Sequence, residues 1–239
     1  MPEPVRIAMW SGPRNLSTAM MRSFSQRADC AVVDEPFYGA YLALTGIEHP
    51  MRDDTLAAME TDPESVANGL VGPVPDGRAI YYQKHMTHHM VDGVPRDWAD
   101  KTVQVFLLRH PARVMASYAV KRAGAALEDL GFEAQAALFD ACASPIVVDA
   151  EDISRDPEAM LRRLCDAIGV GWDPVMLSWP AGPDAADGVW GRHWYNAIWR
   201  STGFAPWTET PLPEVTDRDG YGLAMDIYER LRVGRLRGD

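Results

Sequence analysis

The sequence predicts an α/β fold: a parallel sheet of five strands with helices on both of its faces, which makes three layers. Two observations support this prediction. Five short apolar runs, each about the length of a strand, alternate with longer stretches that have the character of helices. The runs are apolar almost throughout, and not only at every second residue. That pattern is typical of parallel strands that helices cover on both faces.

The first strand is predicted over residues 5–10, and a helix over residues 17–27 follows it after a short polar loop. A helix that begins near Ser17 directs its free backbone N–H groups and the positive end of its dipole at this loop. Arg14 and the hydroxyl groups of Ser17 and Thr18 add further hydrogen-bond donors. The sequence therefore predicts an anion site, most naturally for a phosphate.

The other four strands are predicted from the same kind of apolar run. Residues 45–78 are rich in Asp, Glu, Pro and Gly, and we expect them to leave the sheet and to contain one short helix near residues 63–69. Glu35, Lys84 and Arg109 follow or end strands, where an open α/β sheet binds its ligands. The four runs are residues 30–34, 79–84, 102–108 and 145–149.

The later helices alternate with these strands, and the end of the chain is expected to be irregular. Residues 180–220 are rich in proline and carry four of the eight tryptophans. Within an aromatic-rich tail over residues 170–239, residues 190–196 fit either a lid over a ligand, with Arg192 on an anion, or plain hydrophobic packing. The predicted helices are residues 111–123, 132–143, 156–168 and 222–233.

Composition limits the classes of function. The 239 residues fit one α/β domain over residues 1–239. With 23 Lys and Arg against 34 Asp and Glu, the net charge of −11 argues against a nucleic-acid partner. The three cysteines do not suggest a disulfide framework, and no apolar run approaches the roughly 18 residues of a membrane helix. We expect a cytoplasmic protein that acts on a small molecule without a membrane partner, and we leave a homo-oligomer open.

A second anion signal follows the fourth strand. Arg109 leaves the end of that strand, and Pro111 stands at the first position of the next helix. Ser117 lies eight residues beyond Arg109, about two helical turns into the helix, so that both side chains can reach one phosphate. Taken alone, the same residues also fit an arginine in a salt bridge and a packed serine.

Together the two signals resemble the donor-binding motifs of the sulfotransferase superfamily. The sequence Pro13-Arg14-x-x-Ser17-Thr18 resembles the first motif, and Arg109 with Ser117 resembles the second. A third segment, residues 149–169, is similar to the E-D-L…D-P…L…G stretch that follows the fifth strand in that family. The resemblance covers roughly residues 5–170.

The resemblance implies a P-loop-like fold and the transfer of a sulfuryl group from 3′-phosphoadenosine 5′-phosphosulfate (PAPS) to a hydroxyl or amine of a small acceptor, with no metal required. It implies that Arg14 neutralises charge on the leaving phosphate, that the first loop holds the 5′-phosphate, and that the second motif holds the 3′-phosphate. The donor-binding residues so implied are Arg14, Asn15, Ser17, Thr18, Arg109 and Ser117. The chain departs from the family by having Leu16 where many members have glycine, although leucine resists a positive φ.

Two residues compete for the role of general base. Glu35 follows the second strand, where some sulfotransferases carry a catalytic glutamate, and we favour it because it directly follows the donor-binding unit. His85 stands beside Lys84 and resembles the lysine-x-histidine neighbourhood of cytosolic sulfotransferases, although the two residues are adjacent here. A histidine is a suitable base at neutral pH, whereas a glutamate needs a raised pKa. Lys84 is a second candidate to act with Arg14 at the leaving group.

Three other interpretations remain open. A kinase of the same fold needs the Walker sequence Gly-Lys-Ser/Thr, which the first loop lacks. A non-catalytic protein that kept the nucleotide site would bind the donor without turnover. His85 and His89, four residues apart, fit a metal site on one helix face, but no cysteine or paired carboxylate accompanies them.

Overall fold

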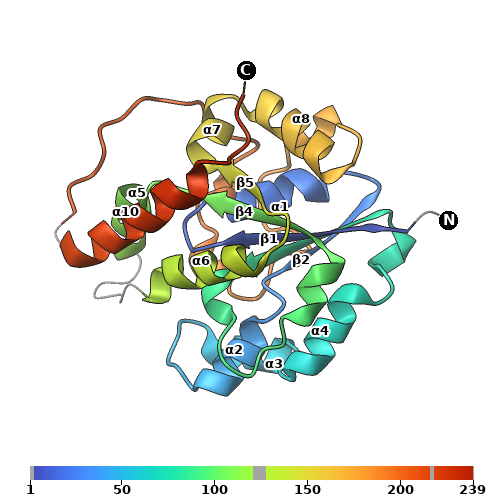
Figure 1. Ribbon diagram of the computed structural model, residues 1–239. Helices are drawn as coiled ribbons and strands as arrows, with labels where there is room; N and C mark the ends of the chain where they lie inside the picture. The colour runs from blue at the N-terminus through green and yellow to red at the C-terminus, as the bar shows by residue number, and fades with distance from the viewer. Residues whose placement is uncertain (1–2, 121–127, 216–217, 239) are drawn as a thin grey trace.

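The chain folds around a five-stranded sheet in which all neighbouring strands run parallel (Figure 1). The computed structural model describes residues 3–120, 128–215 and 218–238. The strand order is β2-β3-β1-β4-β5. The strands are β1 (Val5–Ser11), β2 (Cys30–Asp34), β3 (Ile80–Met86), β4 (Val103–Leu108) and β5 (Ile146–Asp149). The five predicted strands and their parallel sheet are confirmed.

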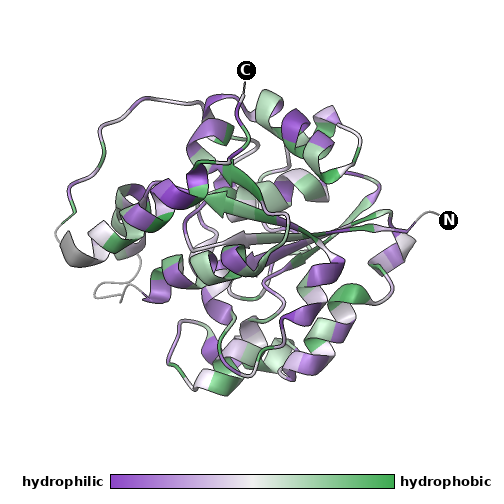
Figure 2. Cartoon of the chain, viewed as in Figure 1, coloured by the Kyte–Doolittle hydropathy of each residue, from purple (hydrophilic) through white to green (hydrophobic). Residues whose placement is uncertain are grey.

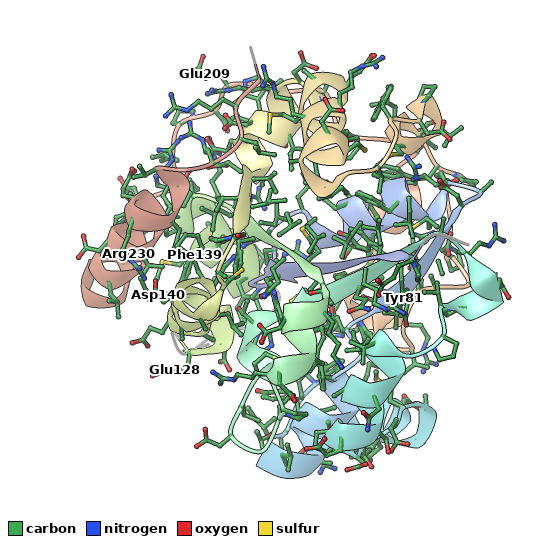
Figure 3. All side chains as sticks on the ribbon, turned by 45° about the vertical axis from the view of Figure 1, so that its right-hand side comes forward. Tyr81, Glu128, Phe139, Asp140, Glu209 and Arg230 are labelled. Carbon is green, nitrogen blue, oxygen red and sulfur yellow. The ribbon has the colours of Figure 1, made fainter. Side chains whose placement is uncertain are left out.

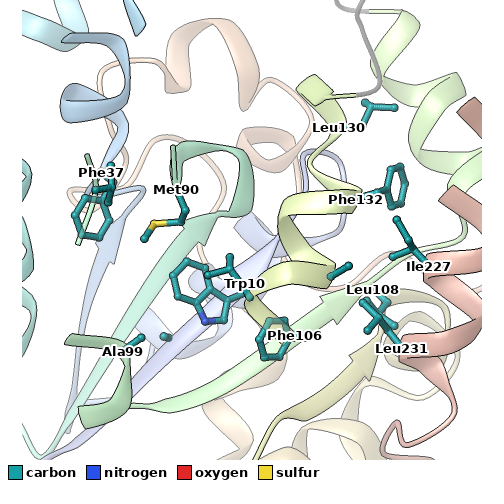
Figure 4. Packing of buried hydrophobic residues seen from close by; sticks show 14 of the residues in the cluster. Trp10, Phe37, Met90, Ala99, Phe106, Leu108, Leu130, Phe132, Ile227 and Leu231 are labelled. Atoms are coloured by element: carbon teal, nitrogen blue, oxygen red, sulfur yellow. The ribbon is translucent and has the colours of Figure 1, made fainter. Parts of the chain in front are cut away.

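Helices cover both faces of the sheet, which confirms the three predicted layers. On one face, α1 and α8 pack against Ile7 and Met9 of β1. On the other face, α4, α6 and α10 surround Trp10 and Phe106 (Figure 4). Neighbouring residues of β1 thus enter opposite cores, as the two-residue period of a strand requires. The helices named here are α1 (Ser17–Ser25), α4 (Pro63–Val71), α6 (Phe132–Ala141), α8 (Pro157–Ile168) and α10 (Arg218–Arg232).

Five further α-helices lie in the described parts of the chain, and the last of them, α9 (Gly191–Trp194), belongs to the segment after α8. The predicted helix over 111–123 is α5 (Pro111–Ala119), and its predicted residues 121–123 lie outside the described residues. A separate short helix, α7 (Ala150–Arg155), precedes α8, because Pro157 opens a new helix. The sequence prediction missed two helices. The helix α2 (Tyr38–Thr45) lies just before residues 45–78, which were expected to hold one helix, and α3 (Arg52–Ala58) lies within them.

Hydropathy follows the layers. The strands are mostly hydrophobic, and the helices carry hydrophilic residues on their outer sides (Figure 2). At the surface, Asp140 of α6 and Arg230 of α10 form an ion pair at 2.6 Å (Figure 3). Because both side chains are about half exposed, this pair adds little to the stability. No helix in the described parts of the chain is both long and apolar enough to cross a bilayer.

The aromatic-rich segment after α8 is fastened to the sheet by buried polar contacts. Arg22 of α1 is buried and pairs with Asp187 at 2.6 Å and with Asp184 at 3.0 Å. The backbone N–H of Gly188 donates to Asp34 at the end of β2. Between Trp179 and Ala205 this irregular segment therefore passes close to the carboxyl ends of the strands, where the predicted site residues stand.

Candidate active site

A cavity of about 330 Å³ opens at the carboxyl ends of the parallel strands. Most of its wall comes from the loop between β1 and α1, the ends of β2 and β3, the turn after β3, and the aromatic-rich segment after α8. His49, Arg109 and Tyr118 add to it from other parts of the chain. Seven of the predicted site residues line it, whereas Ser117 and His85 do not: the seven are Arg14, Asn15, Ser17, Thr18, Glu35, Lys84 and Arg109. The fold thus brings Arg14 and Arg109, which are 95 positions apart in the chain, to one cavity.

The loop between β1 and α1 turns sharply enough to aim the start of α1 at the cavity. Arg14 (φ 64°) and Leu16 (φ 71°) both have left-handed backbone conformations. Leucine therefore adopts the positive φ that it resists, at a cost of about 1 kcal/mol or more. Its side chain packs against the core beneath α1, which offsets part of that cost. Ser17 and Thr18 then begin the helix, with first-turn N–H groups that have no partner within the helix.

Asn15 has a structural contact inside the same loop. Its Nδ2 group donates to the backbone oxygen of Leu107 in β4 at 3.2 Å, and the side chain is buried. Gly12 begins the loop, and a Cβ atom there would lie 2.4 Å from the backbone oxygen of Leu130. Only glycine fits at that position. The loop is thus held in one path from both sides.

The two arginines of the predicted anion site lie at one end of the cavity. Arg14 Nε donates to the Ser117 hydroxyl at 2.9 Å, and Arg109 Nη1 donates to the backbone oxygen of Arg14 at 2.5 Å. Burial lowers the pKa of both side chains, but arginine stays charged at any ordinary pH. Among the ion pairs of the described residues, neither arginine has a carboxylate partner. This end of the cavity is therefore poised to bind an anion.

Lys84 lies at the opposite side of the same loop, in a buried cluster at the ends of β2 and β3. Its Nζ group donates to Asp34 Oδ1 at 2.7 Å, to Glu35 Oε1 at 2.5 Å and to the Tyr195 hydroxyl at 2.8 Å. An ammonium group has three N–H donors, so all three are used. In this arrangement Lys84 holds Glu35, and no donor is left for a leaving group.

Burial raises the pKa of Glu35, because the carboxylate loses its hydration. The charge of Lys84 opposes this effect, and the nearby charge of Asp34 adds to it. A carboxylate with a raised pKa is a better proton acceptor than an exposed one, as the sequence analysis required of this residue. Glu35 also has a left-handed backbone conformation (φ 46°), so it is the third strained residue at this site, with Arg14 and Leu16.

The structure places His85 outside the cavity. Its ring is buried on the other face of the sheet, with ring centroids 4.6 Å from Trp10, 4.9 Å from Trp98 and 6.0 Å from Phe37. Burial lowers the pKa of His85 to about 3, so the ring is neutral. Because Lys84 faces the cavity, its neighbour in the strand must face away. His85 therefore does not face an acceptor bound in the cavity.

We predict that His85 makes the protein sensitive to acid. The pKa of His85 in the folded chain is below its ordinary value of about 6.5. As the pH falls below that value, the unfolded chain binds a proton at His85 and the folded chain does not, so the folded state loses stability. The His85→Phe variant should lose about 2 kcal/mol less stability than the natural chain between pH 7 and pH 5. Urea unfolding at both pH values measures this difference, and equal losses would contradict the burial of a neutral ring.

Sequence reasoning missed the contacts around Glu35, although it had placed Tyr195 in a segment that fits a lid and His89 in a possible metal site. Tyr195 and Asp34 belong to the lysine cluster, and His89 places its Nε2 atom 4.0 Å from Glu35 Oε2. Tyr38 and Tyr41 both stack on the His89 ring, with ring centroids 4.7 and 4.8 Å from it. The position of Asp34 at a strand end was a usable signal. The others reach the site through folding contacts that leave no local pattern.

Residues 190–196 contribute to the cavity wall and also pack in a hydrophobic cluster with Tyr38 and Leu42, so a lid and plain packing both stay open for this segment. Trp190, Trp194 and Tyr195 all line the cavity. Arg192 instead pairs with Asp54 at 3.2 Å on the exposed surface, so the structure does not bring it to an anion in the cavity. Within the described parts of the chain, no group of three or more His, Cys, Asp or Glu side chains has the arrangement of a metal site.

The third motif, residues 149–169, has a local structural role. The Asp149 carboxylate accepts from the N–H of Glu151 at the start of α7, and the Asp156 carboxylate accepts from the N–H of Ala159 at the start of α8. Gly169 ends α8 with a left-handed conformation (φ 77°). Caps of this kind satisfy the free backbone groups of helix ends. The motif therefore builds the two helices that follow β5.

Known proteins resemble this chain in sequence and in fold. The sequence model of the family described as "Sulfotransferase domain" matches residues 5–234. Two curated proteins of Arabidopsis thaliana are similar in sequence. Branched-chain-amino-acid aminotransferase-like protein 1 is 38% identical over 97% of the chain, and protein 2 of the same name is 37% identical over 83% of it. The chain spans 42% and 36% of the length of these relatives.

Two solved structures share the fold. The sulfotransferase domain from the Synechococcus PCC 7002 olefin synthase superposes with a TM-score of 0.57 at 17% identity, over 95% of both chains. The sulfotransferase domain from the curacin biosynthetic pathway superposes with a TM-score of 0.60 at 14% identity, over 95% of this chain and 97% of that one. The fold implied by the sequence motifs is therefore confirmed.

Proposed function

This chain belongs to the sulfotransferase domain family, and on that premise we propose that it transfers a sulfuryl group from PAPS to a hydroxyl or amine of a small acceptor. One observation carries the proposal. A single cavity has two arginines at one end, which have no carboxylate partner among the described residues, and a buried carboxylate with a raised pKa on the other side of the loop between β1 and α1. The first feature suits a polyanionic donor, and the second suits removal of a proton from an acceptor.

The donor would lie over the loop between β1 and α1. Ser17, Thr18 and the first N–H groups of α1 would hold the 5′-phosphate, and Arg14 would neutralise the charge that develops as the sulfuryl group leaves. Arg109 would hold the 3′-phosphate. Ser117 is a hydrogen-bond acceptor for Arg14 in this structure, so it would orient that arginine as well as contact the donor.

The acceptor would lie between the donor loop and the aromatic wall. Glu35 would take the proton as the acceptor oxygen or nitrogen forms its bond to sulfur and the bond from sulfur to the 5′-phosphate oxygen breaks. The other product is 3′-phosphoadenosine 5′-phosphate. Lys84 would keep Glu35 in place and ionised enough to act, since its charge opposes the effect of burial on the pKa of Glu35.

The printed names of the two curated relatives refer to aminotransferases, and they describe proteins more than twice as long as the matched segment. We propose that this chain corresponds to a sulfotransferase part of such proteins, because the family match covers residues 5–234. The test is incubation with PAPS labelled in its sulfuryl group and a panel of neutral alcohols, phenols and amines. Label in an acceptor supports the proposal. Binding of ATP with magnesium in preference to the bisphosphate would favour a kinase, and donor binding without any product would favour a non-catalytic protein.

We predict that Arg109→Ala weakens binding of 3′-phosphoadenosine 5′-phosphate more than binding of AMP. A charge-assisted contact of this kind is worth about 1.5 to 3 kcal/mol, which corresponds to roughly a ten- to hundredfold rise in Kd for the bisphosphate only. Titration calorimetry with both ligands gives the two values. Arg192→Ala is the matched control, since Arg192 lies on the exposed surface. Equal losses for both ligands would overturn the assignment of the 3′-phosphate to Arg109.

A further inference from the structure

Tyr195 is the one member of the lysine cluster that comes from the irregular segment after α8. It is buried, and its hydroxyl lies among the charged groups of Asp34, Glu35 and Lys84. We propose that Tyr195 is a positioning residue for Glu35. Its hydroxyl holds the side chains of Asp34 and Lys84 so that one carboxylate oxygen of Glu35 stays bound to Lys84 and the other stays available to the acceptor. This inference rests on the proposed function of the same site.

The hydrogen bonds of the Tyr195 hydroxyl are fully used. It accepts from Lys84 Nζ at 2.8 Å and from Trp190 Nε1 at 3.1 Å, and it donates to Asp34 Oδ2 at 2.7 Å. A tyrosine hydroxyl has one donor and two acceptor positions, so these contacts fill it. The same O–H group makes a second, longer contact, as donor to Glu35 Oε1 at 3.4 Å. The hydroxyl therefore fixes the direction of Lys84 and of Asp34 at the same time.

The two oxygens of Glu35 are consequently not equivalent. Oε1 accepts the 2.5 Å hydrogen bond from Lys84. Oε2 receives no hydrogen bond from the described residues, and the neutral ring of His89 lies near it, with Nε2 at 4.0 Å. Glu35 lines the cavity, so Oε2 is the oxygen available to an acceptor. If the cluster were free to rotate, Lys84 could bind either oxygen and cover the reactive one.

The segment that carries Tyr195 is held in place by contacts that do not involve its hydroxyl. Asp187 pairs with the buried Arg22, and its Oδ2 atom also accepts from Trp199 Nε1 at 2.8 Å. Gly188 N–H donates to Asp34 Oδ2 at 3.2 Å. Since these anchors stand on both sides of Tyr195 in the sequence, removing one oxygen atom leaves the ring in position. A Tyr195→Phe change therefore removes the hydroxyl and keeps the aromatic ring in the wall of the cavity.

The groups that face Glu35 come from four elements: Asp34 from the end of β2, Lys84 from β3, His89 from the turn after β3, and Tyr195. The Tyr195 hydroxyl lowers the pKa of Glu35, because it stabilises the charged form. Burial keeps His89 neutral by lowering its pKa far below the ordinary value, so it does not titrate in the same range. Loss of the hydroxyl should therefore raise the pKa of Glu35.

The experiment compares Tyr195→Phe with the natural chain by two measurements. In the pH dependence of kcat, the acidic limb should move to higher pH by about half to one pH unit, and kcat at pH 7 should fall about ten- to hundredfold while the KM of the donor stays within about twofold. A carbon-13 titration of the glutamate carboxyls, assigned by the signal missing in Glu35→Gln, should show the same upward movement without requiring turnover.

Tyr228→Phe is the matched control, since it removes a similar buried tyrosine hydrogen bond, 2.6 Å long, to Asp149 at another strand end. It should lower the melting temperature about as much as Tyr195→Phe and leave the Glu35 titration where it was. An unmoved Glu35 titration in Tyr195→Phe, or an equal movement in Tyr228→Phe, would overturn the proposal. If the natural chain forms no sulfated product, the proposed function fails, while the carboxyl titration still decides whether Tyr195 controls Glu35.

Discussion

Glu35→Gln is expected to lower kcat by about 10²- to 10⁴-fold and to leave the Kd of 3′-phosphoadenosine 5′-phosphate within about twofold of the natural value. Glutamine keeps the size of the side chain and can still accept the hydrogen bond from Lys84, but it cannot take up a proton. Lys84 keeps Asp34 as a counterion at 2.7 Å, so the cluster retains a neutralised cation. The loss should therefore fall on turnover and not on donor binding.

Three measurements decide this prediction. Single-turnover kinetics with labelled PAPS gives the rate, calorimetry gives the Kd of the bisphosphate, and thermal unfolding shows that the variant is folded. Glu133→Gln is the control, because Glu133 is an exposed glutamate on α6. A variant with natural kcat would remove Glu35 from the role of base. His89 would then be the next candidate, since its ring lies in the cavity wall 4.0 Å from Glu35.

The parts of the site that were predictable depend on local sequence. A strand, a turn and a helix that follow one another determine where Arg14, Ser17 and Thr18 lie, because neither the strand end nor the helix start needs a distant contact. The same holds for Arg109 at the end of β4. The hydrogen-bond partner of Ser117 was not predictable in this way. The sequence predicts that Ser117 and Arg109 bind one phosphate, and in the structure the Ser117 hydroxyl accepts a hydrogen bond from Arg14.

His85 was predicted to face the site, and strand geometry explains why it does not. Lys84 and His85 are adjacent in β3, so they cannot both face one cavity, and the lysine faces it. The helix α2 was missed because Tyr38–Thr45 is apolar on all sides and shows no helical period. The contact between Lys84 and Tyr195 joins residues 111 positions apart. No periodicity in a single sequence indicates such a pair.

Lys84→Met should destabilise the fold by about 3 to 5 kcal/mol, because it leaves two buried carboxylates, Asp34 and Glu35, without their cation. For a chain of this size the loss corresponds to a fall in melting temperature of roughly 6 to 20 °C. Methionine fills much of the same volume, so the cost comes from charge and not from a void. Lys101→Met, at an exposed lysine, should leave the melting temperature within about 2 °C of the natural value.

The destabilisation of Lys84→Met should also depend on pH in a defined direction. The charge of Lys84 lowers the pKa of Glu35 in the natural chain, so its removal lets burial raise that pKa further. A carboxyl whose pKa is higher in the folded than in the unfolded chain is protonated preferentially in the folded chain, and its contribution to stability is lost as the pH rises through the folded value. The gap in melting temperature between variant and natural chain should therefore narrow from pH 8 to pH 5. A difference in melting temperature that is constant, or that widens as the pH falls, would mean that the charge of Lys84 does not offset the cost of burying Asp34 and Glu35 as carboxylates.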